Sequence, residues 1–177
     1  MQIPEDIKYL SAYNIGQLLH KKKLCPIDLV NFYLHEINSF NEPSPFTVLT
    51  KRRALIEAGL SKKRISDEKI LSPLDGVPIA WKDLFDFKGL RTQGGSKLLE
   101  NNKPALIDAY TVSLAKKAGL IQLGKTSTVE FALGGLGTNN NFIMPENAIM
   151  KDCPRVPGGS SSGSGVALAN NLCAASI

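Results

Sequence analysis

The sequence predicts an α/β protein, with a mixed sheet core flanked by helices. Residues 109–118 have apolar side chains at helical spacing, and the apolar stretch 120–124 follows them directly. A second apolar run, at 77–81, has the length of one buried strand. A helix that leads straight into a strand is typical of α/β sheets. The chain of 177 residues is long enough for one such core and too short for two large ones.

The N-terminal part predicts two packed helices. Apolar residues recur at helical spacing over 10–19, and the lysines at 21–23 place favourable charge at the C-terminal end of that helix. Pro26 suits the first position of a second helix, because its missing N–H would have no partner there anyway. The apolar periodicity of this second helix continues to Phe40.

A short strand at 46–49 and a helix at 51–60 are expected next. Basic residues open this helix at 51–53, and a second basic group at 62–64 falls in the loop expected after it. Such clusters can face RNA, but a solvated helix face with its exit loop explains them equally well. No aromatic residue is interleaved with these charges to favour RNA.

Lys82, at the far end of the run 77–81, is a candidate buried base. The only histidines, His20 and His35, fall on the predicted N-terminal helices and are expected to be structural. A lysine amine removed from water loses its proton more easily than a solvated one and can then act as a base. An ion pair between Lys82 and Asp83 or Asp86 is the alternative at this stage.

The stretch 155–165 is rich in glycine and serine and leads into the apolar run 166–177. Glycine lets backbone amides approach a ligand closely, and serine hydroxyls can donate, accept or attack. A helix that begins at Gly165 would direct its free N–H groups at an anion. A flexible linker is the alternative that composition alone permits.

Two known loop patterns fail in this stretch. A phosphate loop needs lysine after its second glycine, and Ser164 stands there instead. The segment 159–163 reads G-x-S-x-G, as in the nucleophile elbow of α/β-hydrolases, but no strand is predicted before it and no histidine follows it. The glycine-rich segment 134–140 lacks the last glycine of a dinucleotide fingerprint, so we expect an irregular loop there.

Composition indicates the compartment of the protein and the kinds of partner it could have. A net charge of +5 permits nucleic acid as a partner without arguing for it. The three cysteines are widely spaced and indicate neither a disulfide framework nor a zinc site. No signal peptide and no apolar run long enough to span a bilayer is expected. These observations favour a cytoplasmic protein without a membrane partner.

Three motifs, at 73–83, 124–132 and 156–164, resemble the amidase signature family in their order and spacing. The N-terminal helical pair is similar to the start of the same family, so the resemblance covers the chain end to end. It implies an α/β amidase fold, a small-molecule amide as substrate and no metal or organic cofactor. Nucleic acid is an expected partner only if the protein is an amidotransferase.

The resemblance also implies roles for particular residues. Lys82 is similar to the catalytic lysine of a Ser-Ser-Lys triad, and Ser160 to its bridging serine, which follows a cis peptide bond. We therefore expect the Lys82 amine to be shielded from solvent and within hydrogen-bonding reach of the Ser160 hydroxyl. Gly134, Gly135 and Ser161 are expected to contact the substrate.

The third member of the triad does not match any serine of this chain. In the family, the nucleophilic serine follows a helix and a strand that come after the Ser/Gly loop, and Ser162, Ser164 and Ser176 do not fit its motif. We therefore expect residues 1–177 to be the N-terminal part of one amidase domain, truncated within its core. Residues 1–42 would be the helical pair, and 43–177 the start of the catalytic core.

Three functions follow as hypotheses. The first is an amidase-type hydrolase whose present chain lacks the nucleophile and is inactive alone. The second is the A subunit of a tRNA-dependent amidotransferase. The third is a non-catalytic remnant or interaction module, to which a second chain could supply the missing part. We also expect the C-terminal helix and strand to lack the sheet they should join, leaving apolar surface exposed.

Overall fold

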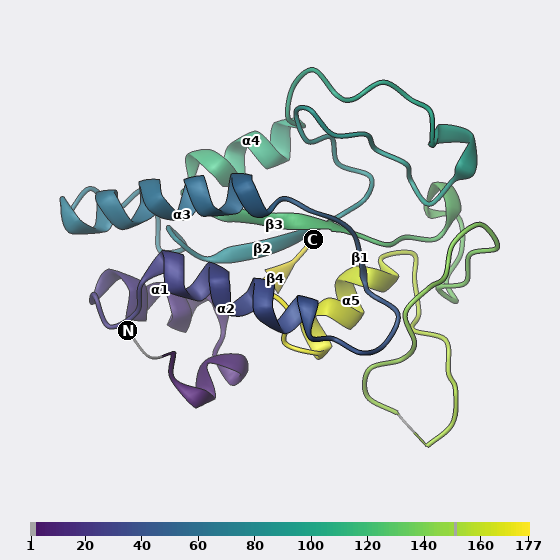
Figure 1. Cartoon of the computed structure of the whole chain (residues 1–177), viewed down its shortest axis with the longest axis horizontal. Helices are drawn as coiled ribbons and strands as arrows, with labels where there is room; N and C mark the ends of the chain where they lie inside the picture. Colours follow the sequence, from purple (N-terminus) through teal and green to yellow (C-terminus); the bar gives the residue numbers. More distant parts are fainter. Residues whose placement is uncertain (1–2, 151) are drawn as a thin grey trace.

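The computed structural model describes residues 3–150 and 152–177 (Figure 1). Its elements in chain order are η1 (Glu5–Tyr9), α1 (Ala12–His20), α2 (Pro26–Asn38), β1 (Phe46–Leu49), α3 (Lys51–Ser66), β2 (Pro78–Lys82), η2 (Lys97–Leu99), α4 (Tyr110–Lys117), β3 (Ile121–Thr126), η3 (Glu130–Ala132), α5 (Ser162–Ala169) and β4 (Ala175–Ser176). In this part of the chain, no helix is both long and apolar enough to cross a lipid bilayer.

The strands form one mixed sheet in the order β1-β3-β2-β4. β2 lies parallel to both β3 and β4, and β1 pairs with β3 in the antiparallel sense. In Figure 1, α3 and α4 lie on one side of β2 and β3, and α5 lies on the other side. The predicted α/β fold with a mixed sheet flanked by helices is therefore confirmed.

Local sequence explains where the N-terminal helices begin and end. The Ser11 hydroxyl accepts a hydrogen bond from the backbone N–H of Asn14 and so caps α1. Pro26 occupies the start of α2 as predicted, and the lysine run begins where α1 ends at His20. His20 is structural, since its ring nitrogen contacts the backbone carbonyl of Asp75 at 3.2 Å.

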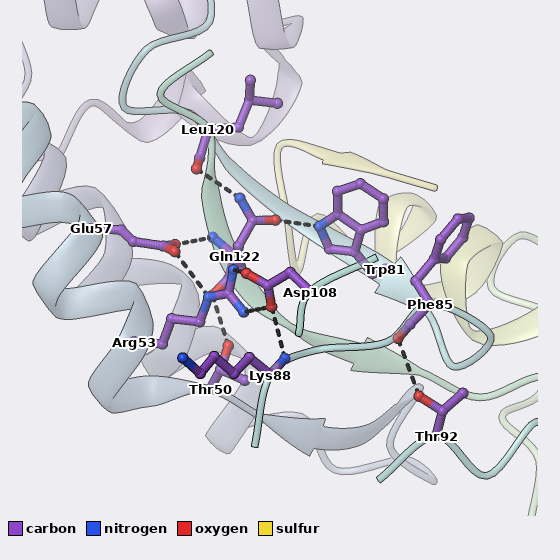
Figure 2. Close-up of polar contacts among 10 residues, drawn as sticks. All are labelled: Thr50, Arg53, Glu57, Trp81, Phe85, Lys88, Thr92, Asp108, Leu120 and Gln122. Carbon is purple, nitrogen blue, oxygen red and sulfur yellow. Dashed lines mark hydrogen bonds and ion pairs between the residues drawn. The ribbon is translucent and has the colours of Figure 1, made fainter. Parts of the chain in front are cut away.

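A polar network fixes α3 to the sheet, as Figure 2 shows. The Arg53 guanidinium donates to Glu57 on the same helix and, through two nitrogens, to the carboxylate of Asp108. Glu57 in turn accepts from the backbone N–H of Gln122 in β3. The Gln122 side chain accepts from the indole N–H of Trp81 in β2. One chain of contacts thus connects α3, both central strands and the loop before α4.

Two elements are longer than predicted. α3 continues to Ser66, so the basic group 62–64 lies within the helix rather than in a loop. Lysine and arginine are good helix formers, and Ile65 is buried and continues the helix's inner face. β3 continues through Lys125 to Thr126, beyond the apolar stretch 120–124, because both polar side chains are fully buried and bonded inside the core.

The C-terminal elements also correct the sequence analysis. α5 begins at Ser162, three residues before Gly165, because its first turn packs against the sheet despite weak helix propensities. The expectation that the C-terminal strand lacks a sheet is wrong, because β4 pairs with β2 and Ala175 lies opposite Ile79. Cys173, just before β4, is 3% exposed, and burial raises the pKa of its thiol to about 12.

Part of the basic charge of α3 is structural. Arg64 donates to both oxygens of Asp75, which is fully buried and also accepts from the Ser61 hydroxyl. Burial alone would raise the pKa of Asp75, but these hydrogen bonds outweigh it and hold the pKa below its ordinary value. Arg53 is neutralised in the network of Figure 2. These two arginines therefore stabilise the fold.

Candidate active site

Lys82 is the last residue of β2 and lies at the edge of the sheet where that strand ends. Its amine donates a hydrogen bond to the Ser160 hydroxyl at 2.5 Å. The side chain is buried, with the residue 8% exposed, and no carboxylate pairs with it in the described part of the chain. Burial lowers the pKa of Lys82 below its ordinary value, because a charged amine is poorly solvated there.

Ser160 is held in place from both sides. The Gly159–Ser160 peptide bond is cis, as the family resemblance implies. The Ser160 carbonyl accepts two hydrogen bonds, one from the Thr128 hydroxyl at 2.9 Å and one from the backbone N–H of Val129 at 3.1 Å. These contacts connect the Ser/Gly loop to the segment after β3 and fix the hydroxyl opposite Lys82.

A second buried lysine lies on the neighbouring strand. Lys125 of β3 is fully buried and forms an ion pair with Asp83, the residue after Lys82. Its amine also donates to the Thr92 hydroxyl at 2.8 Å and to the Arg91 carbonyl at 3.0 Å. Asp83 is thus paired with a different cation, and Asp86 accepts from the Thr92 hydroxyl at 2.7 Å. Lys82 forms no ion pair with either aspartate, so that alternative is wrong.

The other serines of the loop have different surroundings. The Ser164 hydroxyl contacts Thr126 at 2.8 Å and donates to the carbonyl of Ile177 at 2.9 Å, so its role is structural. Ser162 is buried and its hydroxyl makes no hydrogen bond to another described residue. Ser161 precedes α5 and is exposed beside Ser160, which leaves its side chain available to a ligand.

The loop at 134–137 lies against the Ser/Gly loop. The backbone N–H of Gly158 donates to the Leu136 carbonyl at 3.1 Å, and a Cβ on Gly159 would approach the backbone of Gly137 to 3.0 Å. Gly134 and Gly135 are both exposed in this irregular loop. They therefore lie on the segment that borders Ser160, which is compatible with the predicted substrate contact.

Sequence reasoning missed three residues of this centre. Lys125, Thr126 and Thr128 lie at or just after the end of β3, beyond the apolar stretch 120–124 from which the strand was predicted. Thr126 is the register partner of Lys82 and donates to the Trp81 carbonyl at 3.1 Å. All three belong to the motif at 124–132, so the motif itself was the signal that could have identified them.

The arrangement suits proton transfer. A lysine with a lowered pKa can hold a neutral amine, and a neutral amine can accept a proton from a serine hydroxyl at hydrogen-bonding distance. Ser160 has its own hydroxyl free to accept a proton from a third group in turn. Among the described residues, no cluster of three or more histidine, cysteine, aspartate or glutamate side chains could hold a metal ion.

Comparison with known proteins gives the family. The amidase family model matches residues 28–177. Two curated relatives are glutamyl-tRNA(Gln) amidotransferase subunits A. The subunit from Methylobacillus flagellatus is 37% identical over 166 residues, which are 93% of this chain and 33% of the relative. The subunit from Coxiella burnetii is 38% identical over 159 residues, which are 89% of this chain and 32% of the relative.

Solved structures agree with this match. The peptide amidase of Stenotrophomonas maltophilia superposes with a TM-score of 0.79 and 28% identity, over 92% of this chain and 34% of its own. A vestigial protein complex, described as revealing the origins of an s-triazine catabolic enzyme, gives a TM-score of 0.86 and 32% identity, over 93% of this chain and 36% of its own. The chain spans about a third of the length of the curated relatives it matches. It belongs to the amidase signature family.

Proposed function

We propose that this chain carries the lysine and the bridging serine of an amidase that cleaves a carboxylic amide C–N bond through a Ser-Ser-Lys triad. The observation that carries the proposal is the 2.5 Å hydrogen bond between a buried Lys82 amine and the Ser160 hydroxyl. The lowered pKa of Lys82 supports it, because a base must be unprotonated to act near neutral pH. Gly134 and Gly135, in the loop that lies against the Ser/Gly loop, and Ser161, next to Ser160, are proposed to contact the substrate.

The proposed reaction proceeds in two steps. The neutral Lys82 amine takes the proton of Ser160 while Ser160 takes the proton of a nucleophilic serine, whose oxygen then attacks the amide carbon. The proton held by Lys82 returns through Ser160 to the leaving nitrogen as the C–N bond breaks, so that ammonia or an amine departs and an acyl-enzyme remains. Water then attacks the acyl-enzyme and gives its proton to Ser160 and Lys82. That proton returns to the nucleophilic serine as the ester bond breaks. The mechanism uses neither a metal nor an organic cofactor.

The nucleophilic serine is proposed to lie outside residues 1–177. On this proposal the chain is the N-terminal part of one amidase domain, with the helical pair at 1–42 and the start of the catalytic core at 43–177. The matched share of the curated relatives, about a third of their length, supports it. The serine would then come from a further segment of the protein or from a second chain docked against the edge of the sheet at β4.

Amide hydrolysis by the protein as its gene encodes it tests the role of the lysine and serine. Ammonia release from glutamine and from simple primary amides would be measured for the wild type and for Lys82→Ala and Ser160→Ala. Each substitution is expected to reduce kcat/KM by about 10² to 10⁴-fold, the usual contribution of a general base. Lys62→Ala on the exposed side of α3 is the matched control. Unchanged rates in both site variants would reject the proposed roles.

Labelling residues 1–177 with a serine-directed fluorophosphonate tests the position of the nucleophile separately. We expect no stoichiometric labelling, because an unactivated serine reacts poorly with such a reagent. Stoichiometric labelling of Ser162, Ser164 or Ser176 would show that the chain holds its own nucleophile. Peptide mapping by mass spectrometry would identify the serine.

The names of the curated relatives favour one alternative function, the A subunit of a tRNA-dependent amidotransferase. That function predicts transfer of an amide nitrogen to glutamyl-tRNA(Gln) once partner subunits are added, which a simple amidase would not perform. A non-catalytic remnant remains the third hypothesis. It predicts that no form of the protein, alone or with its co-purifying partner, releases ammonia from any amide.

A further inference from the structure

An open groove of about 740 Å³ lies along the outer side of α3, away from the Lys82–Ser160 pair. It is bounded by the start of α3, by the segment 88–90 and by single residues before and on α4. The lining residues that carry the argument are Lys51, Arg52, Ile56, Leu60, Lys88 and Lys116. None of these residues takes part in the proposed amidase reaction, so the groove needs an explanation of its own.

The floor of the groove is aliphatic. Ile56 and Leu60 are 55% and 53% exposed and lie four residues apart, so they are neighbours on one face of α3. Leu49, at the end of β1, is 37% exposed and lines the same groove. The inner face of the helix is already buried against the sheet through Ala54 and Ala58. α3 therefore has two apolar faces, of which the fold covers only one.

The rim of the groove is positively charged. Its lining contains the cations Lys51, Arg52, Arg53, Lys88 and Lys116 and the carboxylates Glu57 and Asp108. Arg53 is paired with both carboxylates, as Figure 2 shows. The four remaining cations are exposed and make no ion pair with the residues that the structure describes, but Lys116 acts electrostatically on Glu57 and Asp108. The charge available to a ligand at this rim is therefore positive.

The walls of the groove are fixed before any ligand arrives. Glu57 accepts from the backbone of Gln122 in β3, and Asp108 accepts from the backbone N–H of Lys88 at 2.8 Å. The Arg53 guanidinium also lies over the Phe87 ring, 4.7 Å from its centroid. A surface that is already ordered loses little conformational entropy on binding, which favours association.

We infer that this groove binds an acidic amphipathic helix of a partner protein. Charge complementarity identifies the polar face of the partner, since the five cations and two carboxylates that line the groove leave a net charge of +3. The aliphatic floor identifies its other face, because leucine and isoleucine at positions four apart contact the apolar stripe of a helix in the helix-in-groove mode. RNA fits less well, because single-stranded bases stack on aromatic rings and the groove has none among its lining residues.

The probe for this inference is a fluorescein-labelled peptide of about 18 residues, with leucine at helical spacing and glutamate elsewhere. Fluorescence anisotropy would measure its binding to the full chain. A peptide of the same composition in scrambled order, which is not amphipathic, is the peptide control. We expect the amphipathic peptide to bind at least ~10-fold more tightly than the scrambled one, and to weaken as salt is raised from about 50 to about 300 mM.

Two groove variants and one matched variant test the location. Ile56→Glu with Leu60→Glu, and separately Lys51→Glu with Arg52→Glu, are each expected to weaken binding at least ~10-fold. Lys62→Glu with Lys63→Glu makes the same charge change on the same helix, outside the groove, and should weaken binding less than ~3-fold after the salt effect is considered. Circular dichroism would verify that each variant keeps its fold.

Three results would overturn the inference. The first is no binding of the amphipathic peptide, or binding no tighter than that of the scrambled peptide. The second is equal weakening by the groove variants and the Lys62/Lys63 variant, which would indicate nonspecific charge attraction. The third is tighter binding of a single-stranded RNA of about 20 nucleotides, lost on Lys51→Glu with Arg52→Glu, which would assign the groove to nucleic acid.

Discussion

Lys82 and Lys125 stand on adjacent parallel strands, one residue out of register, and both are buried. Lys125 has an aspartate as its ion-pair partner, and its amine also donates to a hydroxyl and to a carbonyl oxygen. Lys82 has a serine hydroxyl as its partner and no carboxylate among the described residues. A buried lysine is therefore a structural cation in one strand and a candidate base in the other.

The difference shows that the partner, rather than burial alone, decides what a buried lysine can do. Asp83 is adjacent to Lys82 in sequence, yet it pairs with Lys125 across the sheet. Asp83 follows the end of β2, and its carboxylate lies against the Lys125 amine and not against the Lys82 amine. Lys125 thus keeps Asp83 occupied and leaves the Lys82 amine without a counterion.

The largest effect is expected from removing the structural cation. Lys125→Met would leave the Asp83 carboxylate, only 3% exposed, without its partner and should lower the free energy of unfolding by about 3–5 kcal/mol. Burial already raises the pKa of Asp83, so the loss should shrink as pH falls and the carboxyl becomes neutral. Urea unfolding followed by circular dichroism measures the free energy of unfolding at each pH. A double variant with Asp83→Asn should recover part of the loss; no recovery would mean that the two side chains are not coupled.

The next largest effect is expected from giving Lys82 a carboxylate partner like that of Lys125. Ser160→Asp places a carboxylate beside the Lys82 amine, which should raise the pKa of that amine by about 1–3 units above the wild-type value. The pH dependence of Lys82 acylation by acetic anhydride, read by mass spectrometry, reports this pKa. Ser160→Asn is the uncharged control of the same shape. An equal shift in both variants would contradict the importance of the partner's charge.

A smaller effect is expected at Thr126, the register partner of Lys82. Thr126→Val removes the hydroxyl that donates to the Trp81 carbonyl and contacts Ser164, which should lower stability by about 1–2 kcal/mol. Thr126→Ser keeps the hydroxyl and should retain most of that stability. Chemical denaturation of the two variants side by side separates the hydrogen bonds from the lost methyl packing. A larger loss in the serine variant would assign the effect to packing.

The smallest effect on stability is expected from Lys82 itself. Lys82→Met should stay within about 1 kcal/mol of the wild type at pH 7, because no ion pair is broken. The pKa of Lys82 is lower in the folded than in the unfolded chain, so the unfolded chain binds more protons between the two values. Wild-type stability should therefore rise relative to Lys82→Met as pH increases through that window. A constant difference from pH 7 to pH 10 would contradict the lowered pKa.

Apolar periodicity predicted most of this fold correctly, including the strand at 46–49 and the buried strand that ends at Lys82. It failed where polar residues are buried, as at Lys125 and Thr126, because their hydrogen-bond partners come from distant parts of the chain. It also failed at the start of α5, where contacts with the sheet override the weak helix propensity of serine and glycine.

The candidate site was predictable only as far as its motifs extend. Lys82 and Ser160 are 78 residues apart, and their contact was expected from the family resemblance rather than from spacing. The groove on α3 could not be predicted, since the pairing of Arg53 with Asp108 links residues 55 positions apart. A run of basic residues does not reveal which members are already neutralised.

Trp81, the residue before Lys82, is the only tryptophan of the chain and is 1% exposed. Its ring packs edge-to-face with Phe85 and Phe87, and its indole N–H is bonded to Gln122 (Figure 2). Residues 1–177 therefore contain a single tryptophan, joined by one peptide bond to the proposed base. Its emission maximum and quenching by acrylamide would report any loosening of β2, whether from a ligand or a substitution, without an added label.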